Sequence, residues 1–75
     1  MEDYKKRFLH EYAELTDRII KLERMLIKYE CGTLDFKPDS PRYVLQNQLD
    51  AMKKYLHCLI LRAEYEKIDL RGLSE

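Results

Sequence analysis

The sequence predicts an all-α fold, a long antiparallel helical hairpin that assembles into a homo-oligomeric helical bundle. Two stretches in which apolar residues recur at alternating steps of three and four predict the helices. A short connection rich in turn-forming residues separates these stretches. With 75 residues the chain has room for one domain at most, and we expect residues 1–75 to form a single helical-hairpin domain.

The first stretch predicts a helix over about residues 4–30. Its apolar stripe consists of Phe8, Tyr12, Leu15, Ile19, Leu22, Leu26 and Tyr29. Ile20 and Ile27 widen this stripe on one flank. Asp3 is a suitable N-cap, and Gly32 fits the position after the C-terminus, where a left-handed backbone is common.

Residues 31–39 form the predicted loop, in which Leu34 and Phe36 are expected to cover one end of the hairpin. The second helix is predicted over about residues 41–70. Ser40 can cap its first free amides, Pro41 fits the first helical position, and Gly72 is expected to end it. Its apolar stripe consists of Leu45, Leu49, Met52, Leu56, Leu59, Ala63 and Leu70.

The second helix carries an additional row of side chains beside its apolar stripe. The row consists of Gln48, Ala51, Tyr55, Cys58, Arg62 and Tyr65. The connection is too short for anything but an antiparallel neighbour, and the seam between two helices covers only one stripe on each. Burial of the remaining apolar surface, at about 25 cal/mol per Å², favours self-association, so we expect this row to face another protomer.

Charge and composition exclude several classes of partner. Lys and Arg total 14, as do Asp and Glu, and the zero net charge argues against duplex nucleic acid or an anionic membrane as the main partner. No apolar run approaches the roughly 20 residues of a membrane span, and the N-terminal residues do not resemble a signal peptide. Two cysteines without a recognisable framework are expected to be free thiols.

Catalytic and metal-binding patterns are absent from the sequence. His57 and Cys58 are adjacent, but neighbouring residues on a helix point about 100° apart and do not form a nucleophile–base pair. There is no pair of cysteines or histidines at ligand spacing and no glycine-rich phosphate loop. We therefore expect no enzyme activity, no metal and no cofactor, with Cys58 packed as a small apolar residue.

A polar row follows the apolar stripe of the first helix, and it has two interpretations. The row consists of Tyr4, Arg7, Glu11, Glu14, Arg18 and Lys21. It can be a solvated face with Arg7–Glu11 and Glu14–Arg18 pairs, each worth a few tenths of a kcal/mol. It can also line an interface pocket, in which arginine and lysine contact phosphate and tyrosine offers a flat surface to a base.

Two sequence patterns resemble those of a known family. The first helix reads Y-x-x-R-F-L-x-E-x-x-E-L-x-x-R-I-x-K-L over residues 4–22, and the second reads Q-L-x-A-M-x-x-Y-L-x-x-L-x-x-R over residues 48–62. Joined by a short loop, they resemble the phage anti-CBASS cyclic-oligonucleotide sponges and related small helical proteins of crAss-like phages. The resemblance covers most of the chain and implies a homohexamer of helical hairpins.

The resemblance also implies ligands and site residues. Proteins of this family bind cyclic di- and trinucleotides without cleaving them, in pockets between protomers. By motif position Tyr4 and Lys21 correspond to dinucleotide contacts, and Arg62 is the candidate in a trinucleotide pocket. Arg7 joins them as a phosphate contact from the polar row. If the alignment near the N-terminus shifts, Tyr12 replaces Tyr4 as the aromatic contact.

The predicted function is that of a phage sponge that sequesters cyclic nucleotide messengers in the cytoplasm of the infected bacterial host. Such a protein blocks CBASS signalling, an anti-phage defence. The alternative is a coiled-coil interaction or scaffolding module that has no nucleotide ligand.

Overall fold

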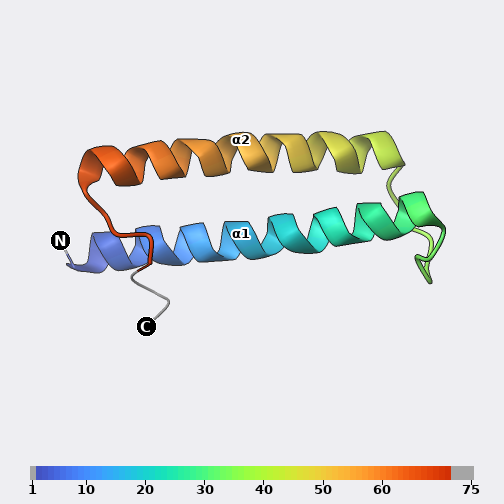
Figure 1. Cartoon of the computed structure of the whole chain (residues 1–75), viewed down its shortest axis with the longest axis horizontal. Coiled ribbons are helices and arrows are strands. Elements are labelled where there is room, and N and C mark those ends of the chain that lie inside the picture. Colours follow the sequence, from blue (N-terminus) through green and yellow to red (C-terminus); the bar gives the residue numbers. More distant parts are fainter. Residues whose placement is uncertain (1, 72–75) are drawn as a thin grey trace.

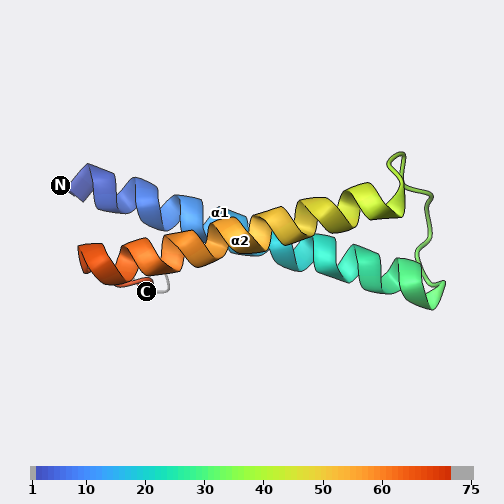
Figure 2. The same ribbon diagram turned by 90° about the horizontal axis from the view of Figure 1, so that it is seen from above.

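The computed structural model describes residues 2–71 and confirms an all-α hairpin of two helices. Helix α1 spans Glu2–Cys31 and helix α2 spans Arg42–Glu66, and the two run antiparallel (Figure 1). The longest dimension is 45 Å, as expected for a 30-residue helix at about 1.5 Å per residue. Seen from above, the helices cross near their middles and diverge toward both ends (Figure 2).

The apolar stripes form the contact between α1 and α2, as their spacing predicts. The buried side chains are Phe8, Leu15, Ile19, Leu26, Leu49, Leu59, Ala63 and Ile68. The half-buried side chains packed against them are Leu9, Tyr12, Leu22, Leu45, Met52, Leu56 and Leu70. By contrast, the additional row of α2 is exposed along its whole length, so the seam within one chain leaves it uncovered.

The end of α1 at Cys31 confirms the predicted role of Gly32. Its φ of +74° lies in the left-handed region, which glycine adopts without steric cost. The Gly32 amide donates to the carbonyl of Tyr29 over 3.2 Å, and the Thr33 amide donates to that of Lys28 over 2.9 Å. These two hydrogen bonds satisfy carbonyl groups in the last turn of α1 that have no partner within the helix. They also direct the chain away from the axis of α1.

The predicted helix starts are each displaced. Asp3 lies inside α1, so it is not the N-cap that the sequence suggested. At the second start Pro41, rather than Ser40, takes the N-cap position, with φ −62° and ψ 153°, and no side chain caps the helix. The loop therefore extends to Pro41. Within it Leu34 is half-buried, whereas Phe36 is 56% exposed and covers less of the hairpin end than expected.

Helix α2 ends at Glu66, four residues before the predicted end. Lys67 adopts a left-handed backbone with φ 59° and ψ 45°, and the Ile68 amide donates to the carbonyl of Ala63 over 2.9 Å. The chain then folds back toward the N-terminal part of α1 (Figure 1). This turn buries Ile68 to 7% exposure, and its burial in the core explains why the helix stops early. Gly72, the predicted end, lies outside the described residues.

Candidate functional site

An open groove of about 300 Å³ lies where the start of α1 meets the second half of α2. Its lining residues are Tyr4, Arg7, Phe8, Glu11, Tyr55, Leu59 and Arg62. Three of the four candidate ligand contacts, Tyr4, Arg7 and Arg62, thus come together although they lie at opposite ends of the chain. We call this surface the Tyr4–Arg62 groove.

A closed set of hydrogen bonds fixes the polar side of the groove. The Tyr4 hydroxyl donates to Glu66 Oε1 over 2.6 Å, and Arg62 Nε donates to Glu66 Oε2 over 3.1 Å. Arg62 Nη2 donates to the Tyr4 oxygen. Glu66 therefore accepts hydrogen bonds from both Tyr4 and Arg62, and it ties the first turn of α1 to the last turn of α2.

The same hydrogen bonds shift the pKa values of Tyr4, Arg62 and Glu66. The hydrogen bond to the Glu66 carboxylate is the main reason that the pKa of Tyr4 is raised. The same carboxylate raises the pKa of Arg62. The hydrogen bonds from Tyr4 and then Arg62 lower the pKa of Glu66. At neutral pH the set consists of a neutral phenol, a guanidinium cation and a carboxylate.

Aromatic rings orient the cation in the groove. The guanidinium carbon of Arg62 lies 5.0 Å from the centre of the Phe8 ring, within cation–π range. The Tyr4 and Phe8 ring centres are 6.4 Å apart and tilted at 49°. Tyr4 and Tyr55 remain 39% and 45% exposed, so both can receive a flat ring. The groove therefore combines cations with aromatic surfaces.

The remaining candidate contact, Lys21, lies outside the Tyr4–Arg62 groove. It is 17 positions from Tyr4 on α1, about 25 Å along the helix axis. Its Nζ pairs with the carboxylate of Asp17 at 3.0 Å. Lys21 lines a separate groove of about 280 Å³ together with Arg24, Met25, Lys28, Leu34, Asp35 and Phe36.

The polar row on α1 is a solvated face at some positions and lines the Tyr4–Arg62 groove at others. Arg18 and Glu14 form the exposed pair at 3.6 Å, as a solvated face predicts. No salt bridge joins Arg7 to Glu11; both side chains line the groove instead. Tyr12, the competing aromatic, is half-buried and packed against the core, so it offers less free surface than Tyr4.

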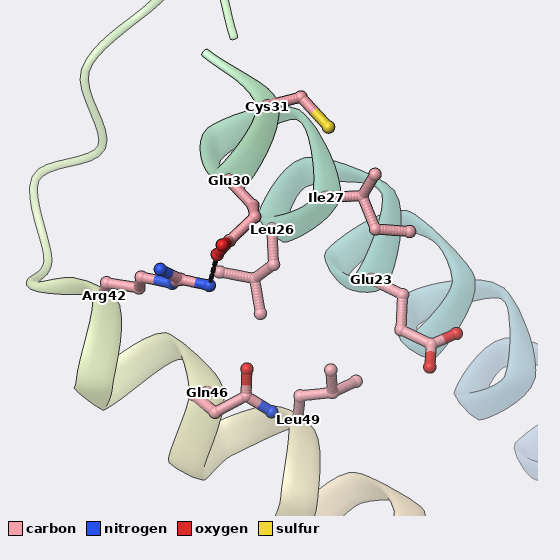
Figure 3. Close-up of a pocket in the computed structure, with 8 residues that line it drawn as sticks. All are labelled: Glu23, Leu26, Ile27, Glu30, Cys31, Arg42, Gln46 and Leu49. Atoms are coloured by element: carbon pink, nitrogen blue, oxygen red, sulfur yellow. Dashed lines mark hydrogen bonds and ion pairs between the residues drawn. The ribbon is translucent and has the colours of Figure 1, made fainter. Parts of the chain in front are cut away.

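A third groove, of about 290 Å³, lies at the loop end of the hairpin (Figure 3). Glu30 on α1 and Arg42 on α2 form an ion pair across it, and Leu26 and Leu49 supply an apolar wall (Figure 3). Arg42 also lies 5.7 Å from the Tyr29 ring centre. This groove therefore has a single arginine, paired with a carboxylate, against a mainly apolar wall, whereas the Tyr4–Arg62 groove has two arginines.

Sequence reasoning missed several residues of the Tyr4–Arg62 groove. Phe8 was assigned to the core, and Tyr55 was placed in the row that faces another protomer and was not among the candidate ligand contacts. Glu66 was not singled out, although its spacing of four from Arg62 on one helix is a pairing signal. Cys58 is a free thiol that is exposed within one chain, so it does not pack in the seam between α1 and α2.

The described residues offer neither a metal-binding cluster nor a membrane-spanning helix. No group of three or more histidine, cysteine, aspartate or glutamate side chains at metal-binding distance occurs among them. Neither α1 nor α2 is long and apolar enough to cross a membrane.

Fold and groove together define a small helical-hairpin protein with an open surface suited to binding a ligand. The chain belongs to the Sequestin family, whose model matches residues 2–65 and so includes both helices almost completely. The family name indicates a protein that sequesters a ligand rather than an enzyme, in agreement with the resemblance to the sponge proteins. No curated protein and no solved structure matches the chain.

Proposed function

We propose that this protein is a phage-encoded sponge that binds cyclic di- and trinucleotide messengers and keeps them from their effectors. It would act in the cytoplasm of the infected bacterial host and block CBASS signalling there. The observation that carries the proposal is the Tyr4–Arg62 groove, which gathers two arginines and exposed tyrosines from both helices. Membership of the Sequestin family supports the sequestering role.

The chemistry of the groove suits a cyclic nucleotide. Such a ligand carries ionised phosphates and flat bases in one compact ring. Arg62 can donate two parallel hydrogen bonds to phosphate oxygens, and Arg7 adds a second cation nearby. The exposed rings of Tyr4 and Tyr55 offer surfaces for base stacking. Because these cations act locally, the zero net charge of the chain does not oppose binding.

A second copy of the chain is needed if Lys21 also contacts the ligand. Tyr4 and Lys21 are about 25 Å apart along α1, farther than a cyclic dinucleotide extends. The two residues must then come from different protomers of a homo-oligomer. The exposed row of α2 supplies a contact surface for that assembly, and the resemblance to the sponge family suggests six subunits.

Sequestration requires affinity and no chemical step on the ligand. Binding energy alone keeps the messenger from its effector, provided that the protein is abundant. The proposal therefore predicts that bound ligand is recovered intact after the protein is denatured.

The alternative is a protein-interaction or scaffolding module. The observation that favours it is the exposed row of α2, in which Tyr65 is 85% and Tyr55 is 45% exposed. This row repeats at steps of three and four, as in a helix that pairs with another helix. A module of this kind would have no affinity for nucleotides.

The test is a calorimetric titration of the purified protein with cyclic di-AMP, cyclic di-GMP, cyclic GMP–AMP and cyclic tri-adenylate. We expect saturable binding to at least one of them, and loss of roughly tenfold or more in affinity for Arg62→Gln and Tyr4→Ala. Lys21→Ala should weaken dinucleotide binding and leave the oligomer assembled. Arg18→Gln, which removes an exposed cation outside the groove, is the matched control and should bind normally.

Each outcome of the titration has a definite meaning. Absence of heat across the whole panel would exclude the sponge and leave the interaction module. Binding that survives Arg62→Gln and Tyr4→Ala would move the site away from this groove. Cleaved ligand after denaturation would contradict sequestration.

A further inference from the structure

Glu66 accepts the hydrogen bonds that Tyr4 and Arg62 could otherwise donate to a bound anion. One oxygen of its carboxylate accepts from Tyr4 and the other accepts from Arg62. A phosphate oxygen needs the same donors, because carboxylates and phosphates bind the guanidinium fork in the same way. A ligand phosphate and the Glu66 carboxylate therefore cannot both be bound to Arg62 in this geometry.

The charges along the groove show the effect of Glu66. Arg7 and Arg62 are its cations, and Glu11 and Glu66 are the carboxylates beside them. With Glu66 in place, these four side chains sum to zero charge at neutral pH. When Glu66 leaves, the groove gains one positive charge and two free donor groups.

The position of Glu66 allows it to leave without unfolding anything. It is the last residue of α2, and its side chain is 35% exposed. A negative charge at a helix C-terminus is unfavourable because the helix dipole is negative there. Rotation of its side-chain bonds alone can move the carboxylate into water while the backbone of α2 and its C-cap at Lys67 stay in place.

We propose that Glu66 is a built-in competitor, which occupies the phosphate position on Arg62 and Tyr4 in the free protein and is displaced when a cyclic nucleotide binds. This inference rests on the proposed function and adds a residue that sets its affinity. Glu66 keeps Arg62 and Tyr4 oriented before binding, and it reduces the affinity for every anion that must replace it.

The experiment compares Glu66→Gln with the native protein in titrations with the same panel of four cyclic nucleotides at about 0.15 M salt. The amide keeps the size of the side chain and removes its charge, so affinity should rise about two- to fivefold, the factor expected when an exposed ion pair need not be broken. Glu64→Gln is the matched control. Glu64 is exposed two residues earlier, about 200° around α2, and its loss should leave affinity unchanged.

A second comparison separates displacement from simple charge repulsion. In the Arg62→Gln background no guanidinium remains to be released, so Glu66→Gln should change affinity by less than about twofold. A full gain in that background, or equal or weaker binding by Glu66→Gln alone, would overturn the inference and leave the proposed function standing. Absence of binding by the native protein and by Glu66→Gln would instead overturn both. Circular dichroism verifies that each variant is folded.

Discussion

Replacement of Leu59 by alanine should remove a large part of the stability of the hairpin. Among the described residues Leu59 is the most buried large side chain, at 1% exposure, and it belongs to the seam while also lining the Tyr4–Arg62 groove. Leucine-to-alanine changes in a core cost about 2–5 kcal/mol, and we expect about 2–4 here because the new cavity opens partly toward the groove. For 75 residues the total stability is about 4–11 kcal/mol.

The assay is thermal and urea unfolding followed by circular dichroism, without ligand and at one protein concentration. The expected loss corresponds to a fall in Tm of about 10–25 °C for a chain of this size. Leu61→Ala is the matched control, since it makes the same chemical change at a position on α2 that is 46% exposed, and it should cost less than about 1 kcal/mol. Equal losses for the two variants would refute the reasoning, because they would show that the face of α2 assigned to the seam is not the one that stabilises the protein.

Three further predictions concern the helix ends and the Tyr4–Arg62 groove. Gly32→Ala should destabilise the protein by about 1 kcal/mol, since the φ of +74° disfavours a side chain although a Cβ there meets no atom within 4 Å; an unchanged urea midpoint would contradict the left-handed turn. Lys67→Gly should stabilise by up to about 1 kcal/mol by relieving the φ of 59° at the end of α2, and a loss of stability would argue against that backbone conformation. The third concerns pH: the hydrogen bonds from Tyr4 and Arg62 lower the pKa of Glu66 from its ordinary 4.5. Their stabilising contribution is therefore present above pH 4.5 and is lost as the pH falls through the lower pKa of the folded protein. In acid titrations the stability difference between the native protein and Glu66→Gln should shrink below pH 4.5, and a difference that stays constant down to pH 3 would exclude this linkage.

The Tyr4–Arg62 groove could be predicted only in part. Local patterns indicated Tyr4, Arg7 and Arg62 as separate candidates, because the polar row and the family resemblance can be read along each helix. Their meeting in one groove depends on the register of the two helices, which results from the packing of both stripes. The bond from Tyr4 to Glu66 was missed for that reason, since it joins residues 62 positions apart, whereas the pair of Glu66 with Arg62 could have been read from their spacing of four.

The helix boundaries could also be predicted where they depend on local backbone preference, but not where they depend on packing between the helices. Gly32 was predicted correctly because its role follows from local backbone sterics. The end of α2 was not, because a good helical pattern continued toward Leu70 and the early stop depends on burying Ile68 against the other helix. At Pro41 the structure shifts the start by one residue, and local preferences for serine and proline did not decide between the two positions.

The sequence by itself determined that this protein is a two-helix hairpin, most of the residues that form its seam, and that an additional row of α2 stays outside it; Tyr29 and Ile68 are the exceptions, since Tyr29 is exposed and Ile68 is buried. These properties follow from periodicity and local backbone preference, which act between near neighbours along the chain. Only the tertiary structure decided that Tyr4, Arg62 and Glu66 meet, whereas the separation of Lys21 from Tyr4 already follows from their spacing of 17 residues on one helix. The physical reason is that side-chain packing sets the register and divergence of the helices, and these determine which distant residues come within hydrogen-bonding distance.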